Sequence, residues 1–132
     1  MTTQLRIRTD EAFSGFAVPD IEDALAFYRD VLGVDAAPAE MGSLELKLGA
    51  RSVFVYPKPD FEPATYTILN FPVDDIDEAV DAMVERGVAF EHYDGDIATD
   101  ERGVFRGADQ GGGPNIAWFR DPAGNILSII ET

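Results

Sequence analysis

The sequence contains a single histidine, His92, in the segment FEHYDGD. An imidazole titrates near neutral pH, so this residue could act as a general base or as a lone metal ligand. A surface histidine at the end of a strand, without a chemical role, is the simpler interpretation and is favoured here. Catalysis by His92 is kept as an alternative.

Two further motifs resemble ligand sites but lack their defining residues. Asp94, Asp96, Asp100 and Glu101 offer the carboxylate oxygens that calcium prefers, but their spacing does not match a calcium-binding loop. The glycines of 111–114 (GGGP) lack the Gly-Lys-Ser/Thr ending of a phosphate-binding loop. We therefore expect a solvated acidic loop and a flexible hinge.

These motifs lie in a long connection, Asp94 to Pro114, that is longer than most loops of a compact domain. Such loops often cover or contact ligands. Its predicted contact residues are Arg102, Phe105, Arg106 and Gln110. The alternative is a surface excursion with no role in binding.

Aromatic residues on predicted strands are the remaining candidates, because they can provide flat apolar walls for a ligand. Ordinary core packing is the alternative for each of them. Glu45 and Lys47 alternate with leucines and are expected on the wet side of a strand, although a carboxylate facing a ligand is the other reading of Glu45. The aromatic candidates are Phe13, Phe54, Tyr56, Tyr66 and Trp118.

Composition narrows the class of protein. The 132 residues suit one domain, and 45% of them are hydrophobic, which argues against disorder. The net charge of −15 makes nucleic acid and anionic membranes poor partners and suits a cationic ligand, although solubility alone also explains it. The chain has no cysteine, no signal-like N-terminus and no run long enough to span a bilayer, so a cytoplasmic location is expected.

The elements that must position these residues follow from periodicity and caps. A strand is expected at 13–18, followed by a helix that Asp20 caps and Gly33 ends. Short strands are expected next, and prolines then mark a linker. These strands cover residues 35–39, 44–48 and 52–56.

The pattern then restarts 55 residues further on. FAVPDI at 16–21 and FPVDDI at 71–76 share Phe, Val, Asp and Ile, and the second helix ends at Gly87 as the first ends at Gly33. This is an internal repeat of a strand-helix-strands module, expected over about 10–60 and about 64–132. The second copy continues with a strand near 89–93 and a final hairpin. The fold class predicted is α+β, with helices outside and a concavity inside.

The phrases VPDIEDALAFYRDVLG, VDDIDEAVDAMVERG and FRDPAGNILSII resemble the vicinal oxygen chelate superfamily, which includes glyoxalase I, bleomycin resistance proteins and extradiol dioxygenases. The resemblance covers about Phe13 to Glu131. It implies two tandem βαβββ modules in a single domain, 1–132, that form a cupped mixed sheet. It also implies a site inside the cup and, frequently, a homodimer.

Enzymes of this family hold a divalent metal with His, Glu or Gln from the concave face. The resemblance places the first ligand at Phe13, its second-module counterpart at Ile68, and the ligand of the last strand at Ser128. The fourth ligand is expected near Val53 or Val55. None of these residues is a metal ligand, so all four metal positions are expected to be lost, and no metal or other cofactor is expected.

The function predicted is metal-independent binding of a small, partly aromatic or cationic molecule in the cup, either to sequester or to carry it. The alternative is a lyase, isomerase or dioxygenase-like enzyme with a non-standard active site, and a third hypothesis is an interaction module with a closed cup. Catalytic residues are not assigned. The residues expected to bind the ligand are Phe13, Tyr56, Tyr66, Ile68, Phe105, Arg106, Trp118 and Ser128.

Overall fold

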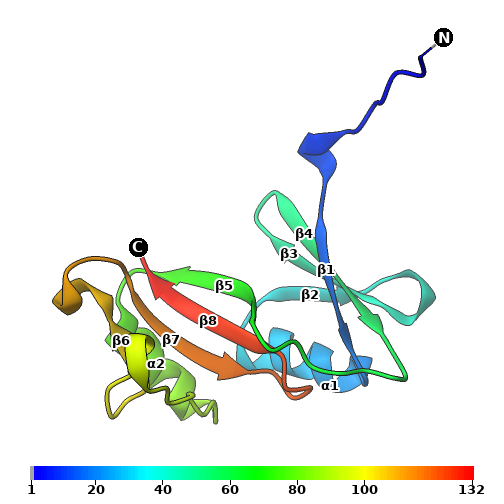
Figure 1. Cartoon of the computed structure of the whole chain (residues 1–132). Helices are drawn as coiled ribbons and strands as arrows, with labels where there is room; N and C mark the ends of the chain where they lie inside the picture. The colour runs from blue at the N-terminus through cyan, green and yellow to red at the C-terminus, as the bar shows by residue number, and fades with distance from the viewer. Residues whose placement is uncertain (1) are drawn as a thin grey trace.

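A computed structural model describes residues 2–132 of the chain (Figure 1). The first module contains one helical segment between its first and second strands, and short 3-10 turns at Thr9–Glu11 and Glu40–Gly42 flank its strands. Its strands are β1 (Ser14–Val18), β2 (Asp35–Pro38), β3 (Leu44–Leu48) and β4 (Arg51–Pro57). Its helix α1 (Ile21–Leu25) continues directly into the π-helical turns η2 (Ala26–Val31).

The second module repeats this order. Its elements are β5 (Thr67–Val73), α2 (Ile76–Glu85), β6 (Val104–Arg106), β7 (Asn115–Arg120) and β8 (Ile126–Glu131), with 3-10 turns η4 (Gly95–Ile97) and η5 (Gly107–Gln110). The strands form two four-stranded mixed sheets, in the orders β1-β4-β3-β2 and β5-β8-β7-β6. In each sheet the first strand lies parallel to the last strand of its own module. The predicted α+β class, with two tandem βαβββ modules and outer helices, is confirmed.

The strand predicted near 89–93 is wrong. That segment forms only an isolated bridge between Phe90 and Phe119, and the corresponding strand, β6, lies within the segment predicted to be a loop. The Asp100 carboxylate explains this placement, because it accepts hydrogen bonds from the backbone N–H groups of Arg102 and Val104 and so forms a turn that leads directly into β6.

Both helices begin as their sequences predict. Asp20 caps α1 by accepting a hydrogen bond from the Asp23 N–H at 3.1 Å, and Asp75 caps α2 through the Glu78 N–H at 3.0 Å. Gly33 follows the first helical segment at a φ of 73°, a backbone conformation that favours glycine. The two helices thus begin with the same capping interaction.

One hydrophobic core joins the two modules. The helix-facing sides of both sheets and the inner faces of both helices contribute to it. The Phe27 ring lies 6.4 Å from the ring of Phe119 of the second sheet, and the Arg86 guanidinium donates to the Val31 carbonyl oxygen at 3.3 Å. The modules therefore pack through their helix sides, and this packing leaves the opposite side of each sheet uncovered.

A buried polar network strengthens this packing. The hydroxyl of Tyr28, which is fully buried, donates to Asp121 Oδ2 at 2.7 Å. Asp121 also accepts hydrogen bonds from the backbone N–H groups of Ala123 and Asn125, and the Asn125 side-chain amide donates to the Ala17 carbonyl oxygen at 3.0 Å. The turn between β7 and β8 is thus attached to the helix and first strand of the other module.

Candidate functional site

Each sheet has one face turned away from its helix, here called its open face. On the first sheet, Gly15 and Glu45 both pair with Phe54 across neighbouring strands. On the second sheet, Asn70 and Trp118 pair with Ser128 in the same way. The repeat therefore makes three pairs of positions equivalent between the modules. Gly15 corresponds to Asn70, Phe54 to Ser128, and Glu45 to Trp118.

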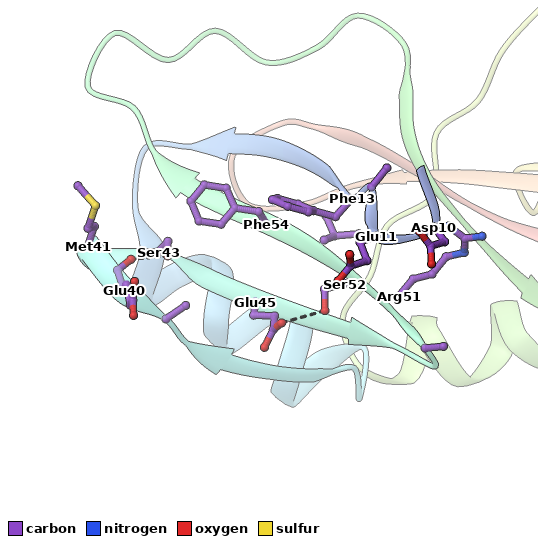
Figure 2. A pocket seen from close by; sticks show the side chains of 14 residues that line it. Asp10, Glu11, Phe13, Glu40, Met41, Ser43, Glu45, Arg51, Ser52 and Phe54 are labelled. Atoms are coloured by element: carbon purple, nitrogen blue, oxygen red, sulfur yellow. Dashed lines mark hydrogen bonds between the residues drawn. The ribbon is translucent and has the colours of Figure 1, made fainter. Parts of the chain in front are cut away.

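The open face of the first module carries a cavity of about 740 Å³ (Figure 2). Phe13 and Phe54 are exposed within it, Phe13 to 70%, and they supply its apolar surface. Residues from the segment before β1, from the β2–β3 connection and from β3 and β4 line it. They are Asp10, Glu11, Ala12, Phe13, Ala39, Glu40, Met41, Ser43, Glu45, Ala50, Arg51, Ser52, Val53 and Phe54.

Glu45 is the carboxylate that the sheet itself positions in this cavity. The Ser52 hydroxyl donates to Glu45 Oε2 at 2.8 Å from the neighbouring strand (Figure 2). The lining includes three further carboxylates and a single guanidinium, that of Arg51, so its net charge is negative. A half-buried, oriented carboxylate beside aromatic rings suits a cation with an apolar body.

Tyr56 extends the aromatic surface beyond the cavity. Its ring stacks on Phe54 with a centroid separation of 5.8 Å and an interplanar angle of 19°. Both rings are exposed, which is uncommon for large aromatic side chains with no partner and typical of binding surfaces. Phe54 and Tyr56 thus form a stacked aromatic surface on β4, and Phe13, just before β1, lines the same cavity as Phe54.

The second module has its own cavity, of about 560 Å³, beside its open face. Tyr66, which is 68% exposed, lies at its rim, and Trp118 and Tyr93 form an edge-to-face pair with centroids 5.4 Å apart. Burial raises the pKa of Tyr93, and the nearby Glu91 raises it further, against the opposing effect of Arg120. Its lining comprises Pro63, Ala64, Thr65, Tyr66, Thr67, Tyr93, Ile97, Trp118, Arg120 and Ile126.

Ser128 lies at the centre of the second open face, but its side chain is fully buried. Its hydroxyl donates to Asn70 Oδ1 on the neighbouring strand, and Trp118 lies across from it on β7. Ile68 sits at an irregularity in the pairing of β5 with β8. Ser128 therefore joins two strands in this structure and does not present a free hydroxyl to the cavity.

The expected position of the fourth metal ligand needs a correction. Val53 and Val55 both point into the core beneath the helix, because side chains alternate along β4. The open-face residue between them is Phe54, which is equivalent to Ser128 in the repeat. The four positions that a metal of this family would use thus hold Phe13, Phe54, Ile68 and Ser128, which offer neither imidazole nor carboxylate and do not fit a divalent metal.

Within residues 2–132, no group of three or more His, Cys, Asp or Glu side chains is placed to hold a metal ion. His92 lies outside both open faces and lines a separate cavity beside α2, of about 620 Å³, with Glu85 and Glu101. If His92 acted as a general base, as the alternative from the sequence requires, its substrate would have to bind on the helix side of the second sheet and not in the cup.

The arginines predicted as loop contacts are paired with carboxylates. Arg106 donates two hydrogen bonds to Asp77 of α2, at 2.6 and 2.9 Å, and a third to Asp100. Arg102 bonds the same Asp77 and also Asp81. These pairs attach the segment before and within β6 to α2, on the side away from the open face.

Phe105 lies on the opposite side of β6 from Arg106, as strand alternation requires. Its ring is 6.4 Å from the Trp118 ring, so it belongs to the aromatic surface of the second module. The eight predicted residues therefore divide: Phe13 and Tyr56 lie on the first open face, four lie on or beside the second, Ile68 packs against the hydrophobic core, and Arg106 lies among carboxylates. The four are Tyr66, Phe105, Trp118 and Ser128.

Residues that sequence reasoning did not select complete these surfaces. Asp10 and Glu11 line the first cavity because the segment before β1 runs beside β4, and no sequence pattern indicates this. Asn70 and Tyr93 complete the second surface. Strand parity points Asn70 to the open side, so its role could have been found from the sequence.

The chain belongs to the family described as the Glyoxalase/Bleomycin resistance protein/Dioxygenase superfamily, whose model matches residues 12–129. No curated protein matches the sequence. No helix of residues 2–132 is long and apolar enough to cross a membrane.

Solved structures of similar fold include proteins of different activities. A protein assigned to the glyoxalase family from Bacillus anthracis is 20% identical, with a TM-score of 0.63 over 100% of this chain and 99% of that chain. The fosfomycin resistance protein FosX from Listeria monocytogenes is 12% identical, with a TM-score of 0.66 over 100% and 95%. TnmS3, an antibiotic-binding protein from Streptomyces sp. CB03234, is 26% identical, with a TM-score of 0.61 over 91% and 94%.

Proposed function

We propose that the protein is a metal-independent binding protein that sequesters or carries a small, flat, cationic aromatic molecule. The observation that carries this proposal is the cavity of the first module, where exposed Phe13 and Phe54 flank the Glu45 carboxylate. An aromatic cation would stack on the rings and pair with the carboxylate. The similarity to antibiotic-binding TnmS3 supports binding as the general class of function.

We also propose that the protein acts as a homodimer in the cytoplasm, with the open face of one module covered by the open face of the other module from a second copy. Each chain leaves both faces exposed, including Phe54 and Tyr66. Facing the two sheets across a dimer would enclose the ligand between Glu45 of one copy and the aromatic surface around Trp118 of its partner. The acidic composition favours a cationic ligand and disfavours nucleic acid.

Three probes of similar shape and different charge test the ligand class. They are 9-aminoacridine, which is a cation, phenazine, which is neutral, and 9-anthracenecarboxylate, which is an anion. Titration calorimetry and thermal unfolding should show binding in the order cation, neutral, anion. Saturation at about 100 times the dissociation constant would raise the free energy of unfolding by about 2.7 kcal/mol.

Two variants locate the site. Glu45→Gln keeps a side chain that can bond Ser52 but removes the charge, and should weaken binding of 9-aminoacridine about tenfold without affecting phenazine. Glu22→Gln, which removes an exposed acid of α1 outside the cavity, is the matched control. Equal binding of all three probes, or dependence of binding on a metal removed by EDTA dialysis, would contradict the proposal.

A further inference from the structure

Residues 2–9 extend away from both sheets (Figure 1). We call residues 2–9 the arm. Every residue of the arm is exposed, including two large aliphatic side chains, Leu5 at 80% and Ile7 at 66%. Among residues 2–132, the hydrogen bonds of the arm are local, such as those from Arg6 to Gln4 and from the Thr9 N–H to the Ile7 carbonyl oxygen. The ion pair between Arg8 and Glu11, at 3.2 Å, is local as well. Leu5 and Ile7 of the arm thus have no packing partner among residues 2–132.

The arm alternates apolar and basic residues in the run QLRIR. In an extended conformation Leu5 and Ile7 point to one side, while Arg6 and Arg8 point to the other. A segment of this kind suits a surface that offers an apolar groove beside carboxylates. The arm carries a charge of +2 and the rest of the chain carries −17, since the total is −15. Charge complementarity therefore favours another copy of this chain as the partner.

The second module offers such a surface at its cavity of about 560 Å³. Tyr66 and Ile97 are exposed at the rim, and Trp118 lies among its lining residues. Asp94 and Asp96 flank this rim in and just before η4, are both exposed, and form no ion pair within residues 2–132. The apolar rim and the free carboxylates lie next to each other, in the arrangement that the two sides of the arm require.

We propose that the arm of one copy docks in this groove of a second copy. Leu5 and Ile7 cover Tyr66 and Ile97, and the arginines face the carboxylates of η4. The docking rests on the second copy invoked under the proposed function but needs no ligand. The arm begins beside the first cavity, where Asp10 and Phe13 form part of the wall. Its docking therefore adds a specific contact next to the open faces that meet in the dimer.

The full-length chain can report this contact directly, because Trp118 is its only tryptophan and lies in the groove. Diluting the protein should shift the tryptophan emission to longer wavelength as the dimer dissociates, in parallel with the mass from sedimentation equilibrium. The double variant Leu5→Asp/Ile7→Asp should weaken the dimer at least tenfold and show the red-shifted emission at concentrations where the native protein is dimeric. Val84→Asp, at an apolar residue of α2 that is 55% exposed outside both open faces, is the matched control and should change the dimer less than threefold.

Charge reversal provides a second test. Arg6→Glu/Arg8→Glu and Asp94→Arg/Asp96→Arg should each weaken the dimer about tenfold or more, and combining the four substitutions should restore it. A dimer that persists in the aspartate variant with unchanged tryptophan emission would overturn arm docking and leave the proposed homodimer intact. A native protein that remains monomeric at all concentrations would overturn both, while binding of 9-aminoacridine by that monomer would still support the ligand site.

Discussion

The buried bond between Tyr28 and Asp121 offers a direct test of how the two modules are held together. Tyr28→Phe removes only the hydroxyl, so the ring keeps its contacts with Phe16 and Phe27, whose centroids lie 5.9 and 5.3 Å away. The Asp121 carboxylate loses a bond of 2.7 Å and stays buried with its remaining backbone and Asn125 donors. A hydrogen bond to a charged group contributes about 1.5–3 kcal/mol, so we expect the free energy of unfolding to fall by that amount.

Urea denaturation followed by circular dichroism measures the change. The slope of the free energy with denaturant should stay constant, because the surface exposed on unfolding is unchanged. Tyr56→Phe is the matched control, since Tyr56 is exposed and its loss of a hydroxyl should change stability by less than about 0.5 kcal/mol. Equal effects of the two substitutions would refute the assignment of the Tyr28–Asp121 hydrogen bond as a stabilising contact between the modules.

The same pair predicts a dependence on alkaline pH. Burial raises the pKa of the Tyr28 phenol well above its ordinary value, and the Asp121 carboxylate raises it further through its charge and its hydrogen bond. The folded state therefore keeps the phenolic proton at a pH where the unfolded chain loses it. The stabilisation is complete below about pH 10 and declines above it, by up to about 1.4 kcal/mol per pH unit. The wild-type protein should lose stability above pH 10 more steeply than Tyr28→Phe.

Three further changes test the site and the loop. Ser128→Glu introduces the carboxylate that the family's metal enzymes carry at this position. Because the position is fully buried, this change should lower the free energy of unfolding by about 3 kcal/mol or more in urea denaturation, whereas Ser128→Ala should lower it by only about 1 kcal/mol. Equal costs of the two substitutions would contradict the burial argument. Asp77→Asn should speed proteolysis between residues 94 and 114 and cost about 0.2–1 kcal/mol, less at high salt, because its pairs with Arg106 are partly exposed. Since hydrogen bonds from Arg106 lower the pKa of Asp77 despite the opposing effect of burial, this contribution is present above about pH 4 and is lost as the pH falls below it; a salt-independent cost would argue against an ionic origin. Gly107→Ala should cost about 1–3 kcal/mol on thermal unfolding, because a Cβ there would lie 2.3 Å from the Pro114 carbonyl oxygen, and an unchanged midpoint would show that the turn can move.

Local signals in the sequence were sufficient for most of the fold. The caps Asp20 and Asp75, the glycines after each helix and the repeat between FAVPDI and FPVDDI all act over a few residues, so they could be interpreted without the tertiary structure. The strand near 89–93 could not be predicted correctly. The Phe90 ring of that segment packs against Phe119, whereas the strand that pairs with β7 is β6, which follows the turn at Asp100.

The sequence by itself determined the family, the two modules and the absence of metal-ligand side chains at Phe13, Ile68 and Ser128, because the chemical type of each side chain is given directly by the sequence. Only the tertiary structure decided which surfaces these residues share. It showed that the hydroxyl of Ser128 is taken by Asn70, that Arg106 is neutralised by Asp77 and Asp100, and that Phe54 occupies the position assigned to a valine. Each depends on pairing between segments far apart in the chain, where strand register and burial decide whether a polar group is free to meet a ligand.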